Sequence, residues 1–235
     1  VQTKAEADAI ERTARTNPHV VASLDQKEES RNPPPPFITS SLQQAAGSRF
    51  RFSPKKTMQV AQELYEGIGG KGLITYMRTD STDLSPEFAA ETAEWLRAHA
   101  PESAAIRPPV YRAKSGAQAA HEAIRPTSVA LTPELARSKL TPDQAKLYGL
   151  IWERAVASQC RPARLSRTRI VVDCADTRWV ARGMGVVDPG YLRFWKNTED
   201  EKTLPKVHVG QRLDLRNLEV DRRMTEPPSR FTEPK

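Results

Sequence analysis

Two polar residues in one short segment have the types and the spacing needed for covalent chemistry on a phosphate. Tyr76 and Arg78 stand two positions apart, after an apolar stretch that predicts a strand over 73–77. In an extended segment, residues i and i+2 project from the same face, so one phosphate would meet a phenol oxygen and a guanidinium together. A phenol has an ordinary pKa of about 10 and is a weak nucleophile when neutral. A neighbouring cation lowers such a pKa and offsets the charge of the phosphate. A strand tyrosine beside an exposed arginine is the alternative interpretation.

A second cluster contains His121 and Glu122, followed by Arg125 and Pro126. Histidine is the side chain whose ordinary pKa allows it to move protons or bind phosphate near neutral pH. A purely structural histidine is the alternative. The spacing is not that of a His-Glu-x-x-His zinc-protease motif, so we expect no zinc site here.

The composition excludes several classes of protein. The 235 residues are enough for one or two domains, and with 38% hydrophobic and 28% charged residues the chain is not of the disordered class. Two cysteines cannot form a multi-disulfide framework or a structural zinc site. No apolar run reaches the roughly 20 residues that span a bilayer. We therefore expect a cytoplasmic protein with no membrane contact. The chain starts at Val1 rather than Met, which suggests a piece of something longer.

The net charge of +7 is concentrated in the last third of the chain. The basic residues there are mostly arginines, whose fork-shaped guanidinium matches phosphate geometry better than an ammonium does. As a group they favour a polyanionic partner. A solvated strand face is the alternative for each arginine taken singly.

The helices are predicted mainly from their starts. Thr3 and Glu6 have capping-box spacing ahead of a helix over 4–15. Thr39 or Ser40 is expected to cap a short helix around 42–46. Four further helices are predicted where Ser or Thr precedes Pro, at 53–54, 85–86, 132–133 and 141–142. The short helix around 42–46, the helix that starts at 54, a glycine-rich bend and the strand over 73–77 together indicate a winged helix-turn-helix arrangement.

Strands are predicted on either side of this helical stretch. They begin near Val20, ahead of the proline run 33–36, and resume at 169–172, 179–181, 207–209 and 213–215. The proline run is the sharpest boundary, because four prolines lack backbone N–H groups and favour an extended path. The pattern predicts an α+β, multi-domain chain in which a mainly helical, winged-helix-like domain is inserted into a β-rich domain.

Several motifs, in order and spacing, resemble bacterial DNA topoisomerases of type IA. They are residues 34–46 (PPPFITSSLQQAA), 54–66 (PKKTMQVAQELYE), 74–81 (ITYMRTDS), 120–126 (AHEAIRP), 147–152 (LYGLIW) and 226–232 (EPPSRFT). The resemblance implies that residues 37–161 form the helical domain with the catalytic tyrosine. It implies that residues 1–36 and 162–235 are two parts of a β-rich arch domain, which lets the tyrosine domain lift away for strand passage.

The resemblance also implies roles for the site residues. Tyr76 matches the nucleophile, which attacks one DNA strand and becomes joined to a 5′ phosphate. Arg78 matches the residue that holds the scissile phosphate, and His121 matches a supporting catalytic residue. Thr79 and Arg125 match positions in the same motifs, and we expect them, with Arg78, to contact DNA. The full reaction relaxes negative supercoils of DNA in the bacterial nucleoid.

The chain departs from the family in what it lacks. The family holds Mg²⁺ with an acidic cluster of the Asp-x-Asp-x-Glu kind, and no such cluster occurs here. We therefore expect Mg²⁺ in the full enzyme but no metal bound to this chain. The partners would be single-stranded DNA and the metal-binding and strand-gripping domains of the same polypeptide, in a monomer. Alone, the chain is expected not to relax supercoils.

Two other functions remain open from the sequence. A non-catalytic winged-helix DNA-binding module explains the helices and the basic charge but leaves Tyr76 and Arg78 incidental. A tyrosine recombinase also joins tyrosine to DNA, but its phosphate-binding Arg and His usually precede the tyrosine, whereas His121 follows Tyr76. Residues 161–235 taken alone are equally consistent with a structural scaffold.

Overall fold

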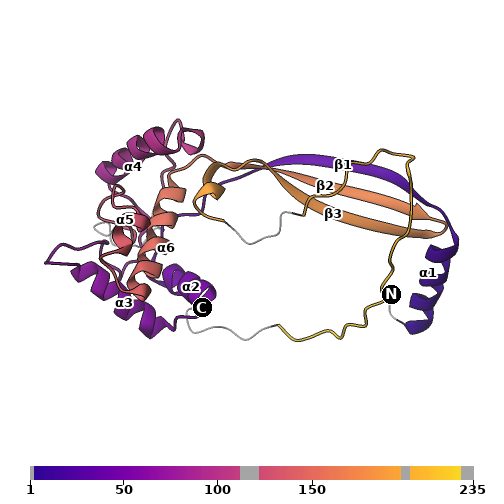
Figure 1. The fold of residues 1–235 in the computed structure, drawn as a ribbon, viewed down its shortest axis with the longest axis horizontal. Coiled ribbons are helices and arrows are strands. Elements are labelled where there is room, and N and C mark those ends of the chain that lie inside the picture. Colours follow the sequence, from indigo (N-terminus) through magenta and orange to yellow (C-terminus); the bar gives the residue numbers. More distant parts are fainter. Residues whose placement is uncertain (1–2, 112–121, 197–201, 229–235) are drawn as a thin grey trace. The chain divides into compact units, whose positions relative to one another are not determined.

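The computed structural model describes residues 3–111, 122–196 and 202–228. Figure 1 shows its helices and strands, which have the following bounds: α1 Lys4–Thr16, β1 His19–Arg31, α2 Thr39–Phe50, α3 Pro54–Glu66, α4 Pro86–His99, η1 Pro101–Ser103, α5 Pro133–Arg137, α6 Pro142–Ser158, β2 Ala163–Cys174, β3 Thr177–Asp188, η2 Gly190–Arg193 and β4 Arg212–Leu213. The chain divides into two compact units. The strand unit comprises the described residues within 1–30, 164–188 and 198–229, and the helical unit those within 31–163 and 189–197.

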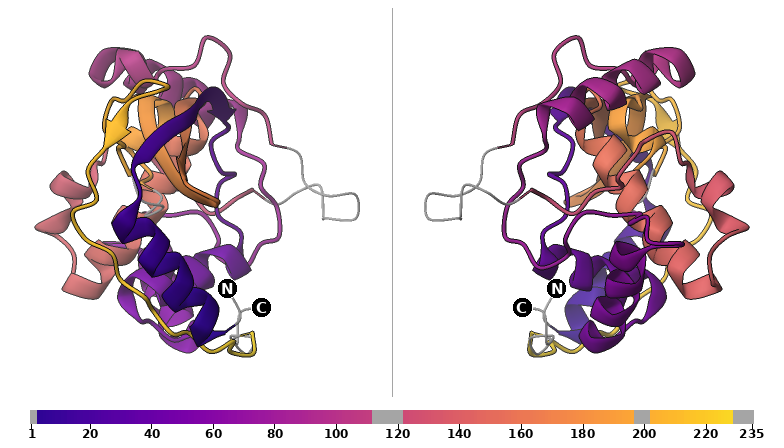
Figure 2. Two further views of the ribbon diagram at one scale, coloured as in Figure 1. Left: turned by 90° about the vertical axis from the view of Figure 1, so that its right-hand side faces the viewer. Right: turned by 90° about the vertical axis from the view of Figure 1, so that its left-hand side faces the viewer.

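The strand unit is a four-stranded sheet in the order β3-β2-β1-β4. Strands β2 and β3 form an antiparallel hairpin, and β4 pairs antiparallel with the start of β1. Helix α1 leads directly into β1, as the end-on views show (Figure 2). The predicted capping box is confirmed, because the Thr3 side chain accepts from the Glu6 N–H and the Glu6 carboxylate accepts from the Thr3 N–H.

Arginines of β2 lie opposite acidic residues of β1. The Arg167 Nε–Glu29 Oε2 distance is 2.8 Å, and the Arg169–Asp25 and Arg164–Glu28 pairs are 3.6 and 3.9 Å apart. Such exposed ion pairs add little stability, but they offset the positive charge of the strand. The arginine-rich pattern of this segment therefore reflects cross-strand pairing within the sheet as well as net charge.

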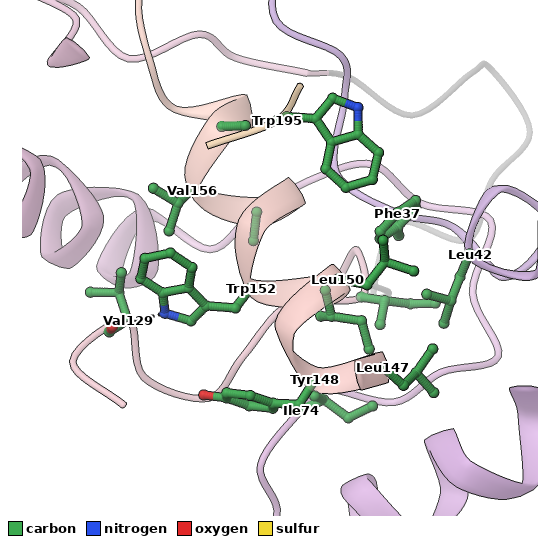
Figure 3. Close-up of a cluster of buried hydrophobic side chains, with 14 of the residues drawn as sticks. Phe37, Leu42, Ile74, Val129, Leu147, Tyr148, Leu150, Trp152, Val156 and Trp195 are labelled. Atoms are coloured by element: carbon green, nitrogen blue, oxygen red, sulfur yellow. Dashed lines mark hydrogen bonds between the residues drawn. The ribbon is translucent and has the colours of Figure 1, made fainter. Parts of the chain in front are cut away.

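The helical unit is built around α6. Leu147 and Ile151 of this helix are fully buried, and Figure 3 shows Leu147 pointing towards Leu42 while Trp152 points the other way, towards Val129. The polar atoms of the buried aromatic residues are satisfied. The Trp152 Nε1–H donates to the Val129 carbonyl at 3.0 Å, and the Tyr148 hydroxyl donates to the Leu131 carbonyl at 2.6 Å. Ile74 and Met77, which flank Tyr76 in the sequence, belong to this core.

The predicted helix starts are confirmed at four places. Ser53, Ser85, Thr132 and Thr141 each accept a hydrogen bond from a backbone N–H of the first turn, and a proline follows each of them. The helix predicted around 42–46 is confirmed as α2, but the prediction of its cap was wrong. Its N-cap position is Ile38 rather than Thr39 or Ser40, because the Thr39 hydroxyl is engaged elsewhere in the fold.

Three predicted strands differ from the structure. Residues 73–77 make only an isolated bridge between Ile74 and Pro126. Proline lacks the N–H that a ladder needs, so pairing stops there. Residues 207–209 run into a turn at Gly210, whose φ of +84° favours glycine. The strand predicted at 213–215 is reduced to β4, Arg212–Leu213.

Candidate active site around Tyr76

The segment from Tyr76 to Ser81 alternates between exposed and buried side chains. Tyr76 is 47% exposed, whereas Met77 is fully buried in the core. Arg78 and Asp80 are exposed, and Thr79 and Ser81 are buried. The segment belongs to no sheet and its backbone bends at Met77 and Arg78, so the shared face that the i, i+2 spacing predicts stays a prediction. The phenol and the guanidinium lie on the solvent side.

Arg78 has no anionic partner within the part of the chain that the structure describes, and nothing there forms a hydrogen bond with its guanidinium. The Tyr76 ring packs edge-on against the ring of Tyr65 in α3, with 5.5 Å between the centroids. An exposed phenol and, two residues away, an exposed guanidinium with no anionic partner among the described residues are groups that suit a phosphodiester. The guanidinium supplies several N–H donors in a fixed plane, which fits two phosphate oxygens at once.

The sequence-distant motifs meet at this segment. The Thr75 N–H donates to the Arg125 carbonyl at 2.9 Å, and the Thr127 N–H donates to the Leu73 carbonyl at 3.0 Å. Residues 122–127 also pair with the start of the helical unit, since the Ile124 N–H donates to the Phe37 carbonyl at 2.8 Å. Residues 37–39, 73–79 and 122–127 thus form one hydrogen-bonded layer over the core.

Arg125 is placed differently from Arg78. Its side chain is only 13% exposed, and its Nη2 and Nε lie 2.7 and 3.1 Å from one carboxylate oxygen of Glu122. The guanidinium also donates to the Pro126 carbonyl and stacks 4.6 Å from the ring centre of Phe88. These contacts occupy most of its donors, so the geometry favours structural support by Arg125 over phosphate binding. DNA contact by Arg125 stays a prediction.

Thr79 is 7% exposed, and its hydroxyl accepts the Ser81 N–H at 3.0 Å. The Ser81 hydroxyl in turn accepts the Asp83 N–H at 3.1 Å. The side chain of Thr79 therefore shapes the chain that follows Arg78, and its contact with DNA stays a prediction. His121 lies outside the described residues, so its expected catalytic role also stays a prediction.

Sequence reasoning missed two residues that hold the segment. Thr39 and Thr75 each use the side-chain hydroxyl both as donor and as acceptor towards backbone groups, Thr39 on residues 77–79 and Thr75 on residues 123–125. Glu122 was noted only for its neighbour His121. Its spacing of three residues from Arg125, with opposite charge, was the available signal for their ion pair.

The described residues show neither a metal-binding cluster nor a membrane-spanning helix. Within residues 3–111, 122–196 and 202–228, no three His, Cys, Asp or Glu side chains gather in a way that would hold a metal ion. The described helices include none that is both long and apolar enough to cross a membrane. Among its described residues, the site thus has no donor set that fits Mg²⁺.

Comparison with known proteins places the chain in a family. The family described as DNA topoisomerase matches residues 1–235. The chain belongs to the DNA topoisomerase family. It is 38% identical to "DNA topoisomerase 1" of Campylobacter jejuni over 99% of its length and 38% identical to "DNA topoisomerase 1" of Helicobacter pylori strain J99 over 97%. These relatives identify the type as the bacterial type IA topoisomerase, which confirms the resemblance read from the motifs.

The fold agrees with this membership in the DNA topoisomerase family. The solved full-length topoisomerase I from Thermotoga maritima is similar over 88% of this chain, with a TM-score of 0.75 and 36% sequence identity. The chain spans about a third of the length of each of these relatives: 34% of the Campylobacter protein, 32% of the Helicobacter protein and 34% of the Thermotoga structure. The predicted α+β mixture of helices and strands is confirmed.

Proposed function

We propose that this chain carries the nucleophile of a type IA topoisomerase and that Tyr76 is that nucleophile. One observation carries the proposal: Tyr76 and Arg78 are both exposed, no described residue pairs with Arg78, and buried Met77 between them anchors the segment to the core. The chain's membership in the DNA topoisomerase family supports the same conclusion. Buried or ion-paired side chains at these positions would have argued for a structural tyrosine instead.

In the proposed reaction, the Tyr76 oxygen attacks the phosphorus of one phosphodiester in single-stranded DNA. The new O–P bond joins Tyr76 to the 5′ phosphate of the downstream strand, and the bond from phosphorus to the 3′ oxygen breaks. That oxygen leaves and takes up a proton, while Tyr76 has lost one. Arg78 holds the phosphate and stabilises the charge that develops on its oxygens. The reverse attack by the 3′ hydroxyl reseals the strand after strand passage.

The two structural units suit the domain roles implied by the family. We propose that the helical unit, with α2 and α3 arranged as in a winged-helix domain, presents Tyr76 to DNA. The strand unit, with its long β1, β2 and β3, would be part of the arch that lets the tyrosine unit lift away. The full enzyme would act as a monomer on DNA in the cytoplasm, with Mg²⁺ held by carboxylates other than those of the described residues.

The polarity of the adduct tests this proposal against a tyrosine recombinase. A single-stranded oligonucleotide is labelled at its 3′ end in one sample and at its 5′ end in another, and each is incubated with a full-length enzyme containing this sequence. We expect the 3′ label to migrate with the denatured protein and the 5′ label to be released on a shorter strand. The opposite pattern would identify a 3′-phosphotyrosine and reject the proposal.

We also expect the 235-residue chain by itself not to relax negatively supercoiled plasmid in the presence of Mg²⁺. It offers the nucleophile and one phosphate ligand, but the described residues hold no cluster that would bind a metal. Electrostatic stabilisation supplied from elsewhere in the enzyme would be lost. Gel electrophoresis of the plasmid provides the measurement, and a ladder of relaxed topoisomers would contradict the expectation.

A further inference from the structure

The side chain of Thr39, the first residue of α2, reaches the backbone on both sides of Arg78. Its hydroxyl donates to the Met77 carbonyl at 2.8 Å, with the Thr79 carbonyl also within 3.1 Å, and it accepts the Thr79 N–H at 2.9 Å. The backbone N–H of Thr39 donates to the Thr79 carbonyl at 2.9 Å. A hydroxyl has one hydrogen to donate and two lone pairs that accept, so this single side chain is a donor and an acceptor at the same time.

These bonds replace those that a sheet would provide. Residues 76–79 belong to no strand, so their N–H and C=O groups lack the regular partners of a ladder. Thr39 satisfies the carbonyl before Arg78 and the N–H after it. Without its hydroxyl, a part-buried donor and a part-buried acceptor would have no partner in the fold, which is costly enough to move a short segment.

The position of this backbone matters because few contacts fix the Tyr76 and Arg78 side chains directly. Tyr76 is half exposed and contacts Tyr65 only through its ring, and no described residue pairs with Arg78. The direction of both side chains is therefore set by the backbone between them. The buried Met77 side chain anchors this backbone to the core, and the Thr39 hydroxyl holds it by hydrogen bonds. A displacement of about 1 Å at a reacting group can slow a reaction by about 100-fold.

We propose that Thr39 is a positioning residue for the cleavage reaction. It holds the backbone of residues 77–79 so that the Tyr76 oxygen and the Arg78 guanidinium address the same phosphate. Thr75 makes a similar pair of bonds, but to residues 123–125 rather than to the backbone on either side of Arg78. The inference rests on the proposed function of Tyr76, and its experiment separates the two.

The test compares three variants in a full-length enzyme containing this sequence. Thr39→Val keeps the shape but removes the hydroxyl, and Thr39→Ser keeps the hydroxyl. Thr127→Val is the matched control, because the Thr127 hydroxyl donates to a backbone carbonyl of the same stretch, that of Gly72 at 3.0 Å, which precedes the reactive residues. Single-turnover cleavage of a labelled single-stranded oligonucleotide gives the rate, and fluorescence anisotropy gives the Kd for the same DNA.

We expect Thr39→Val to cleave about 10- to 100-fold more slowly, with its Kd for DNA nearly unchanged. Thr39→Ser and Thr127→Val are expected to cleave at close to the unmodified rate. A Thr39→Val rate equal to that of Thr127→Val would overturn the proposal. A loss of rate matched by an equal loss of DNA affinity would overturn it as well, because positioning acts on the reaction step.

If Thr39→Val does not fold, Thr39→Cys takes its place beside Thr39→Ser. A thiol is a weak donor and a weak acceptor, so we expect the cysteine variant to cleave about tenfold more slowly than the serine variant. Equal rates would reject the positioning role. Tyr76→Phe is run in parallel. If this variant still forms the covalent adduct, the proposed function fails. If Tyr76→Phe loses the adduct while Thr39→Val stays fully active, only the role of Thr39 is rejected.

Discussion

Tyr76→Phe is expected to abolish the covalent protein–DNA adduct and to lower relaxation by at least about 10⁴-fold, the scale seen when a covalent nucleophile is deleted. The substitution removes one oxygen and keeps the ring, so the packing against Tyr65 is preserved. Affinity for single-stranded DNA is expected to stay the same. Denaturing gel electrophoresis of a trapped adduct measures the first effect, and plasmid relaxation measures the second.

Tyr65→Phe is the matched control for this prediction. Tyr65 is 40% exposed and Tyr76 is 47% exposed, and their rings are in contact, so both phenols are accessible in the same region. We expect Tyr65→Phe to retain adduct formation, because Tyr65 has no equivalent of Arg78 two residues away in an extended segment. If Tyr76→Phe bound DNA and still formed the adduct, the assignment of the nucleophile would be wrong. If neither the original chain nor any variant formed an adduct in the full-length enzyme, the non-catalytic winged-helix function would be favoured.

Arg78→Ala is expected to slow single-strand cleavage by about 10²- to 10³-fold, the usual cost of losing one preorganised group that stabilises charge in a transition state. Arg78→Lys should recover only part of this loss, because an ammonium keeps the charge but cannot bind two phosphate oxygens in a planar fork. Loss of one phosphate contact is also expected to reduce the salt dependence of DNA binding by about one unit of slope.

Arg97→Ala provides the control for charge alone, since Arg97 is an exposed arginine in the last turn of α4. Its cleavage rate is expected to match that of the original enzyme. Equal cleavage rates for Arg78→Ala and Arg97→Ala would contradict the role given to Arg78. A loss confined to DNA affinity in Arg78→Ala would show that Arg78 binds DNA without assisting the reaction.

The helices of this chain were predictable because their signals are local. A serine or threonine followed by proline fixes the cap and the first turn, whatever surrounds the helix, and Gly67 ends α3 in the same local way. The exposure of Tyr76 and Arg78 on either side of buried Met77 agrees with their i, i+2 spacing, although the backbone bends at Met77 and Arg78.

The support of the site was not predictable for the opposite reason. Thr39 resembles a helix cap in sequence, but its hydroxyl is used 38 residues further along the chain, at Met77. The strand expected over 73–77 is limited by Pro126, about 50 residues away, which pairs with Ile74 and cannot continue a ladder. Such long-range partners determine whether a polar residue caps a helix, holds a backbone or faces solvent, and no local pattern identifies them.

The identity of the modified residue tests the account most directly. The covalent adduct of a full-length enzyme is trapped with single-stranded DNA, digested with nuclease and trypsin, and sequenced by mass spectrometry. Trypsin separates Tyr76 from Tyr65, because it cleaves after lysine and arginine. Tyr76 is the only tyrosine in the peptide 72–78, and Tyr65 lies in the peptide 57–71. We predict that the nucleotide remnant is found on Tyr76. A remnant on Tyr65, or on any tyrosine other than Tyr76, would contradict the central claim.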